Sequence, residues 1–156
     1  DVGDERIGVA ISDETGSLAR PLEIIARVAG PSSFRRLAAL IAQHGVESLV
    51  VGLPLLSDGS EGQQARSTRA YLRGLERHVA LPIVLWDERS STQQAREIIA
   101  EAAGPRGPDA EGRFRGARKA RRRADDAVAA AVILQDYLNA RSEAHRAAAG
   151  QAQPGG

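Results

Sequence analysis

The stretch Ser48-Leu49-Val50-Val51-Gly52-Leu53 is a short apolar run without polar alternation. Such a run is typical of a strand covered on both faces, so we expect it near the centre of a sheet. A second run of the same character, Leu81–Trp86, follows it, and residues 63–78 between the two runs have a helical pattern. Strand and helix in alternation predict a sheet with helices on its faces.

Two β-rich segments precede this unit, Arg6–Ile11 and Leu22–Val28. The residues between them, Asp13-Glu14-Thr15-Gly16-Ser17, are turn formers, so we expect two strands joined as a hairpin. Helix-start chemistry follows at residues 31–33, apolar residues then recur at helical spacing, and Gly45 supplies a stop. An amphipathic helix with one buried stripe is therefore predicted after the hairpin.

A third helix is predicted after the second buried strand. Ser91 and Gln94 match a capping box, in which Ser91 is the N-cap and Gln94 reaches back to it. This helix is expected to run to about Ala103, where a Gly-Pro pair follows. Residues 104–123 contain Gly, Pro and Arg but almost no apolar anchors, so we expect a mobile basic loop there.

The last predicted element is an Ala-rich helix that starts at Asp125-Asp126 and carries apolar residues up to Leu138. Residues 140–156 have no apolar stripe and are expected to form a disordered tail. The sequence thus predicts one α/β domain over residues 1–139, in which a mixed central sheet has helices on both faces.

The composition limits the class of protein. The chain of 156 residues has the size of a single domain, and it contains no cysteine, so neither a disulfide framework nor a thiolate metal site is expected. No apolar run approaches the roughly 20 residues that span a bilayer, so we expect a cytoplasmic protein without a membrane partner. The chain lacks methionine and begins with Asp1-Val2-Gly3, which predicts that its first strand is truncated.

Three acidic residues stand at the edges of apolar elements: Asp1 in the first strand, Glu88 after the second apolar run, and Asp126 at a helix start. If they met in space, their charges would repel one another unless cations compensated them, and Mg²⁺ or Mn²⁺ is the natural compensator. Such a cluster suits metal-assisted phosphodiester hydrolysis. The alternative is structural, with Asp126 as a helix cap, Glu88 as a solvated strand end and Asp1 as a turn residue.

Four separate stretches resemble, in order, the signature motifs of the YqgF/RuvX family, and together they cover most of the chain. The first is Asp1–Ala10, which is similar to the family pattern D-x-G-x-x-R-I-G-V-A. The second is Val50–Pro54, which is similar to V-V-G-L-P and is followed by the family's D-G pair at residues 58 and 59.

The other two motifs lie in the second half of the chain. Residues 87–95 resemble D-E-R-L-[ST]-T-x-x-A, with Ser90 in place of the usual leucine. Residues 126–138 resemble D-x-x-A-A-x-x-I-L-Q-x-Y-L, and this match puts Asp126, not Asp125, on the aspartate of the motif.

The resemblance implies an RNase H-like fold, in which a three-strand antiparallel meander continues into parallel strands. It also implies a nuclease that trims the 5′ end of pre-16S rRNA during ribosome biogenesis, and a role in Holliday junction resolution has also been proposed for the family. The catalytic and metal-binding residues would be Asp1, Glu88 and Asp126, with Mg²⁺ or Mn²⁺ as cofactor. Gly52 would allow its backbone to approach nucleic acid closely.

Substrate contacts are expected from two groups of basic residues. Arg6 and Arg89 flank the acidic residues and are candidates for binding phosphates, the alternative being structural ion pairs. The formal net charge is only +1, but basic residues gather at 113–123, where they would follow a nucleic-acid backbone or form a solvated loop. The candidates in this segment are Arg118, Lys119 and Arg121.

Two alternatives to the rRNA nuclease stay open. A DNA junction resolvase would use the same acidic residues and metal ions but would need a homodimer to cut two strands symmetrically. A non-catalytic RNA-binding factor would keep the fold without turnover. The expected partner is therefore a nucleic acid, either pre-rRNA or branched DNA, and the protein is expected to be a monomer or a homodimer.

Overall fold

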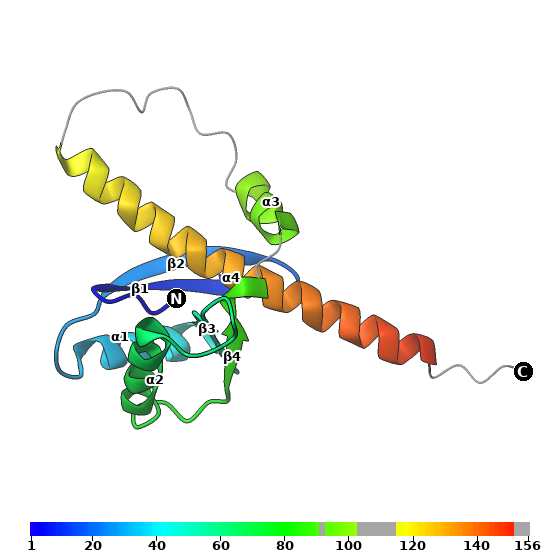
Figure 1. The fold of residues 1–156 in the computed structure, drawn as a ribbon, viewed down its shortest axis with the longest axis horizontal. Helices are drawn as coiled ribbons and strands as arrows, with labels where there is room; N and C mark the ends of the chain where they lie inside the picture. The colour runs from blue at the N-terminus through cyan, green and yellow to red at the C-terminus, as the bar shows by residue number, and fades with distance from the viewer. Residues whose placement is uncertain (91–92, 103–114, 152–156) are drawn as a thin grey trace, which may run out of the picture.

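The computed structural model describes residues 1–90, 93–102 and 115–151, with side chains described for residues 1–89, 95–102 and 126–150. Figure 1 shows the longest helix, α4, lying across one side of β1 and β2, with α1 and α2 on the other side. The elements in chain order are β1 (Arg6–Ser12), β2 (Ala19–Ala26), α1 (Ser32–His44), β3 (Leu49–Leu53), α2 (Gln63–Leu75), β4 (Ile83–Asp87), the 3₁₀ turn η1 (Glu88–Ser90), α3 (Gln93–Ala102) and α4 (Arg115–Gln151).

The strands β1 and β2 pair antiparallel and form the expected hairpin. Asp13 shapes its turn, because its Oδ1 accepts the backbone N–H groups of Leu18 at 3.1 Å and Ser17 at 2.8 Å. These hydrogen bonds hold the pKa of the Asp13 carboxyl below its usual range. Gly16 has a φ of 66°, the left-handed region that favours glycine, so the turn residues read from the sequence are used as predicted.

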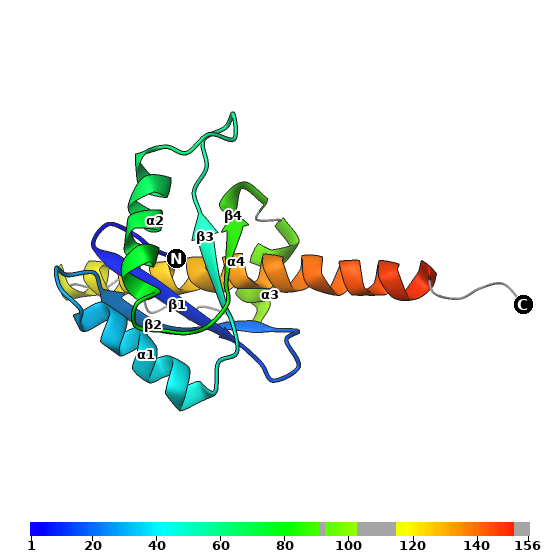
Figure 2. The same cartoon turned by 90° about the horizontal axis from the view of Figure 1, so that it is seen from below.

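The strands β3 and β4 pair in parallel, with Gly52 opposite Trp86, and parallel strands are what the family resemblance implies. Figure 2 shows the two strands side by side. Within the described residues the two strand pairs are separate two-stranded sheets, so one continuous mixed sheet is not seen. The three-strand meander is not confirmed, because Val2 pairs with β1 only through a single bridge to Ile7.

Side chains of β1 alternate between two faces, and each face meets a different core. Ile7 and Val9 pack in a cluster with residues of α1, α2 and β3. Gly8 and Ala10 face α4, where an ideal Cβ on Gly8 would collide with the backbone carbonyl of Asp126. Helices therefore cover both faces of the β1–β2 pair, as the sequence predicts.

The helix α4 differs from the expectation in three ways. Residues 115–123, expected in a mobile loop, are helical; Asp126, expected at a helix start, lies inside the helix; and residues 140–151, expected in a disordered tail, continue it. Alanine, arginine and lysine have high helix propensities, so a helix can extend beyond its packed part without an apolar stripe. The rest of the expected loop, residues 104–114, and of the tail, residues 152–156, lies outside the described residues.

The ends of the shorter helices agree with the sequence where they are described. Gly45 ends α1 in a left-handed conformation, with φ 60°, and its N–H bonds to the carbonyl of Ile41. Ser91 and Gln94, the expected capping pair of α3, fall outside the residues whose side chains are described. None of the helices in the described ranges combines the length and the apolar character that a membrane span requires.

Gln135 of α4 ties the hairpin to the helix from inside the core, where it is 1% exposed. Its Oε1 accepts the backbone N–H of Ala19 at 2.8 Å. Its Nε2 donates to the carbonyl of Ser17 at 2.9 Å and to Oδ1 of Asn139 at 3.0 Å. A buried amide with these partners fixes the end of the hairpin against the helix.

Replacement of Gln135 by leucine is expected to lower the free energy of unfolding by about 1–3 kcal/mol, because the buried N–H of Ala19 loses its acceptor. Denaturant unfolding measures this change. Gln43→Leu is the matched control, since Gln43 is exposed on α1, and it is expected to change stability by less than about 0.5 kcal/mol. Equal stabilities of the two variants would contradict the role of Gln135.

Candidate functional site

Glu88 follows β4 directly, and its carboxylate lies against β3. An ideal Cβ on Gly52 would come within 2.5 Å of Glu88 Oε1 and within 2.9 Å of Ile133 Cδ1. Gly52 is buried, and its missing side chain makes room for the Glu88 carboxylate. Its approach to nucleic acid stays a prediction. Burial raises the pKa of Glu88, the N-terminal ammonium lowers it, and the charge of Asp87 raises it.

Asp1 is held against β1 by its backbone. Its carbonyl accepts the N–H of Gly8 at 2.9 Å, and its amino group donates to the carbonyl of Gly8 at 3.0 Å. Burial lowers the pKa of this amino group to about 6, while the charge of Glu88 raises it. The backbone of Asp1 is therefore within electrostatic reach of Glu88.

Asp126 lies on the face of α4 that meets β1. Arg6 forms an ion pair with it, with 2.8 Å between Nε and Oδ2. Oδ2 is buried and accepts no hydrogen bond from the described residues, so its contact with Arg6 is an ion pair without hydrogen-bond geometry. The sequence leaves two interpretations open for Arg6, phosphate binding and a structural ion pair. In this structure Arg6 forms the ion pair.

The three predicted acidic residues thus occupy neighbouring places without forming a metal site. The backbones of Asp1 and Asp126 both contact Gly8. The charge of Glu88 raises the pKa of the Asp1 amino group. In the described part of the chain, which includes all three, no three acidic or histidine side chains are close enough to hold one metal ion. The charge of Arg6 compensates that of Asp126. Their catalytic assignment stays a prediction.

Arg89 is a predicted phosphate contact, and its guanidinium group donates hydrogen bonds to acceptors of the protein itself. Its Nε lies 3.1 and 3.0 Å from the two carboxylate oxygens of Asp87, and its Nη2 lies 2.6 Å from Oδ2. Its Nη1 donates to the carbonyls of Leu56 and Ser57, both at 3.2 Å. These bonds lower the pKa of the Asp87 carboxyl and fasten the loop after β3 to the end of β4.

The basic candidates Arg118, Lys119 and Arg121 lie on the first turns of α4, where the backbone is helical. Their side chains fall outside the described ones. The structure therefore places these residues on the same helix as Asp126 and leaves their contact with nucleic acid a prediction.

Two contacts that hold these elements together were missed by the sequence reasoning. Arg27 donates to the carbonyl of Gly3 at 2.9 Å and so fixes the segment that follows Asp1. Trp86 Nε1 donates to Oδ2 of Asp136 at 2.9 Å, and Asp136 is 4% exposed. The bond from Trp86 to Asp136 joins β4, the strand that precedes Glu88, to α4. The sequence signal for this bond is Asp136 itself, an acidic residue among the apolar positions of the last predicted helix.

One protein family matches this chain over most of its length. Residues 1–140 match the family described as "RuvX: Holliday junction resolvase". The chain belongs to the RuvX family. A relative from Symbiobacterium thermophilum, named "Putative pre-16S rRNA nuclease", is 42% identical over 142 residues, which are 91% of this chain and 90% of the relative. A relative of the same name from Pelotomaculum thermopropionicum is 40% identical over 158 residues, which cover 100% of this chain and 94% of the relative.

In this RuvX-family chain, Gly52→Ala is expected to displace the Glu88 carboxylate, because the new Cβ needs space that Oε1 occupies. We expect a loss of about 1–3 kcal/mol of stability and a fall in nuclease activity of about 100-fold. Thermal unfolding and a cleavage assay measure the two effects. Gly150→Ala is the control, since an ideal Cβ there meets no atom of the described residues within 4 Å. Full activity of Gly52→Ala would show that the position of Glu88 is not critical.

Proposed function

We propose that this protein is a nuclease that hydrolyses RNA phosphodiester bonds and processes the 5′ end of pre-16S rRNA. Its membership of the RuvX family and the names of its relatives support this function. The structural observation that carries it is the half-buried carboxylate of Glu88 at the carboxyl end of a parallel strand, with Asp1 and α4 beside it. Open α/β sheets commonly bind their ligands at this end of the strands.

The proposal assigns Asp1, Glu88 and Asp126 as catalytic residues and as ligands of Mg²⁺ or Mn²⁺. Carboxylate oxygens are the donors that these ions prefer, and the chain has no cysteine. As they stand, the three residues do not fit a metal ion, because Arg6 already holds Asp126. Ion binding would require Arg6 to release this carboxylate.

RNA binding is proposed along the first turns of α4, through Arg118, Lys119 and Arg121. At a rise of 1.5 Å per residue, these positions precede Asp126 by roughly 8 to 12 Å along the helix axis. Basic residues at this distance would neutralise phosphates that flank the scissile one. Arg6 and Arg89 would reach phosphates only after leaving their carboxylate partners. We also propose that the protein has an RNase H-like strand arrangement, is located in the cytoplasm, and is a monomer or a homodimer.

The second candidate function is resolution of branched DNA. The description of the matched family favours it. The same acidic residues would serve this reaction, but symmetric cutting of two strands would require two copies of the site.

A cleavage assay on structured RNA and on a four-way DNA junction, with Mg²⁺ or Mn²⁺ against EDTA, tests the proposal. We expect metal-dependent RNA cutting, which Glu88→Gln reduces by at least about 100-fold. Glu76→Gln, at an exposed position after α2, is the control and should cut like the unchanged protein. Cutting of the junction alone would favour the resolvase. Binding of RNA without any cutting would replace the nuclease by an RNA-binding factor.

Metal binding is tested separately by thermal unfolding. An ion that binds only the folded state at about 100 times its dissociation constant stabilises it by about 2.7 kcal/mol. Mg²⁺ or Mn²⁺ is therefore expected to raise the melting temperature of the unchanged protein and not that of Glu88→Gln. An equal rise in the melting temperature of both proteins, or no rise in either, would show that Glu88 is not a metal ligand.

A further inference from the structure

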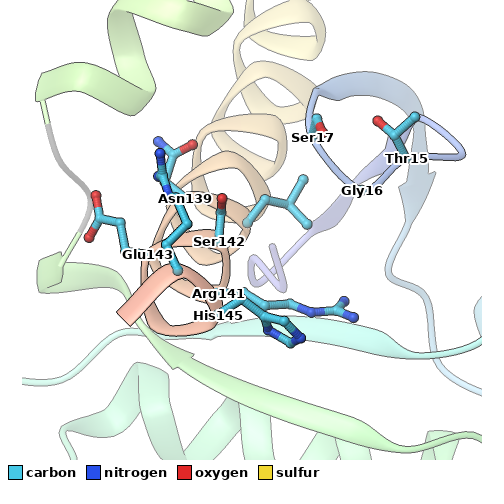
Figure 3. A pocket seen from close by; sticks show the side chains of 10 residues that line it. Thr15, Gly16, Ser17, Asn139, Arg141, Ser142, Glu143 and His145 are labelled. Carbon is cyan, nitrogen blue, oxygen red and sulfur yellow. The ribbon is translucent and has the colours of Figure 1, made fainter. Parts of the chain in front are cut away.

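A hollow of about 370 Å³ lies between the hairpin turn and the C-terminal turns of α4. Figure 3 shows the turn residues Thr15 and Ser17 on one side and the helix residues Asn139, Arg141 and His145 on the other. These helix positions follow Asp126 by 13 to 19 residues, which is roughly 20 to 28 Å along the axis. The hollow is therefore separate from the site formed by Asp1, Glu88 and Asp126.

An amide donor without an acceptor lies at this hollow. Asn139 lines it, and the Nδ2 of Asn139 is buried and has no hydrogen-bond partner among the described residues. A buried donor left unpaired costs about 1–3 kcal/mol, so a group that offers an acceptor there is favoured. Nδ2 is covered in this structure, and the lining residues from Arg141 to Arg146 are exposed, so a ligand that reaches Nδ2 would have to displace the side chains over it.

The orientation of this amide is fixed by its neighbours. Gln135 cannot be flipped, because its Oε1 meets the N–H of Ala19 and its Nε2 meets the carbonyl of Ser17. Its Nε2 also donates to Oδ1 of Asn139, so the oxygen of Asn139 must face Gln135. The two N–H groups of Asn139 are therefore left to face away from Gln135.

The charge around the hollow suits an anion. Arg141, His145 and Arg146 line it, against the single acidic residue Glu143. Within the described part of the chain, neither arginine has an ion pair or a side-chain hydrogen bond. Asn139 and Arg146 are seven residues apart and share one face of the helix, so their donors can converge on one ligand.

We propose that this hollow binds a phosphate group, held by the amide of Asn139 and by Arg141 and Arg146. Phosphate offers several acceptors to a planar arginine fork and to an amide. The phosphate belongs either to the backbone of bound RNA or to a free phosphorylated molecule. The RNA source rests on the proposed function, whereas the site itself does not.

An NMR titration with inorganic phosphate, against sodium chloride at equal ionic strength, tests the site. A saturable shift is expected for the side-chain amide of Asn139, and it should be lost when Arg141→Gln is combined with Arg146→Gln. The matched control combines Arg73→Gln with Arg77→Gln, exposed arginines in and just after α2, and should keep the shift. No saturable shift, or the same shift in both double variants, would overturn the proposal.

RNA binding at several salt concentrations identifies the source of the phosphate. If it is an RNA phosphate, the double variant at Arg141 and Arg146 should lower the slope of log affinity against log salt by about 0.7 to 0.9 for each lost contact. The control double variant should follow the unchanged protein. If inorganic phosphate shifts the Asn139 signal but the double variant leaves the salt slope of RNA binding unchanged, the hollow binds a free phosphorylated ligand. A phosphate shift in a protein that neither binds nor cuts RNA would refute the proposed function and leave the site standing.

Discussion

The close approach of α4 to β1 at Gly8 is the contact on which the rest of the structure depends. Glycine is required there because the backbone carbonyl of Asp126 occupies the place of a Cβ, and Ala130 packs at the same point. This approach brings Asp126 to Arg6 and lets Gln135 reach the end of the hairpin. A larger residue at Gly8 would separate the helix from the strand and disturb both contacts together.

The sequence predicts those elements whose burial leaves a pattern in composition. The strands β3 and β4 have only buried or half-buried residues, and each is an apolar run. The hairpin is marked by turn residues such as Asp13 and Gly16. The ends of α4 leave no such pattern, because residues 115–123 and 140–151 extend beyond its packed part. Their helical state depends on propagation from the packed middle and on propensity, and a search for apolar periodicity overlooks both.

The candidate site is predictable only in part, for a physical reason. The motifs place Glu88 and Asp126 near each other, but they do not reveal which positive charge compensates each carboxylate. Arg6 reaches Asp126 only because α4 lies so close to β1, a tertiary distance that no local pattern contains. Arg89 differs, because its partner Asp87 is two residues away and the pairing is local. Its bonds to the loop after β3 again depend on the fold.

The hydrogen bond from Trp86 to Asp136 has a practical consequence. Trp86 is the only tryptophan of the chain, and it lies two residues before Glu88. Its indole N–H is bonded to α4, and its ring meets the ring of Tyr137 edge-on, with 5.4 Å between centroids. Indole fluorescence is sensitive to such surroundings. The protein therefore carries an intrinsic optical probe, whose emission reports any movement of β4 against α4 without a label.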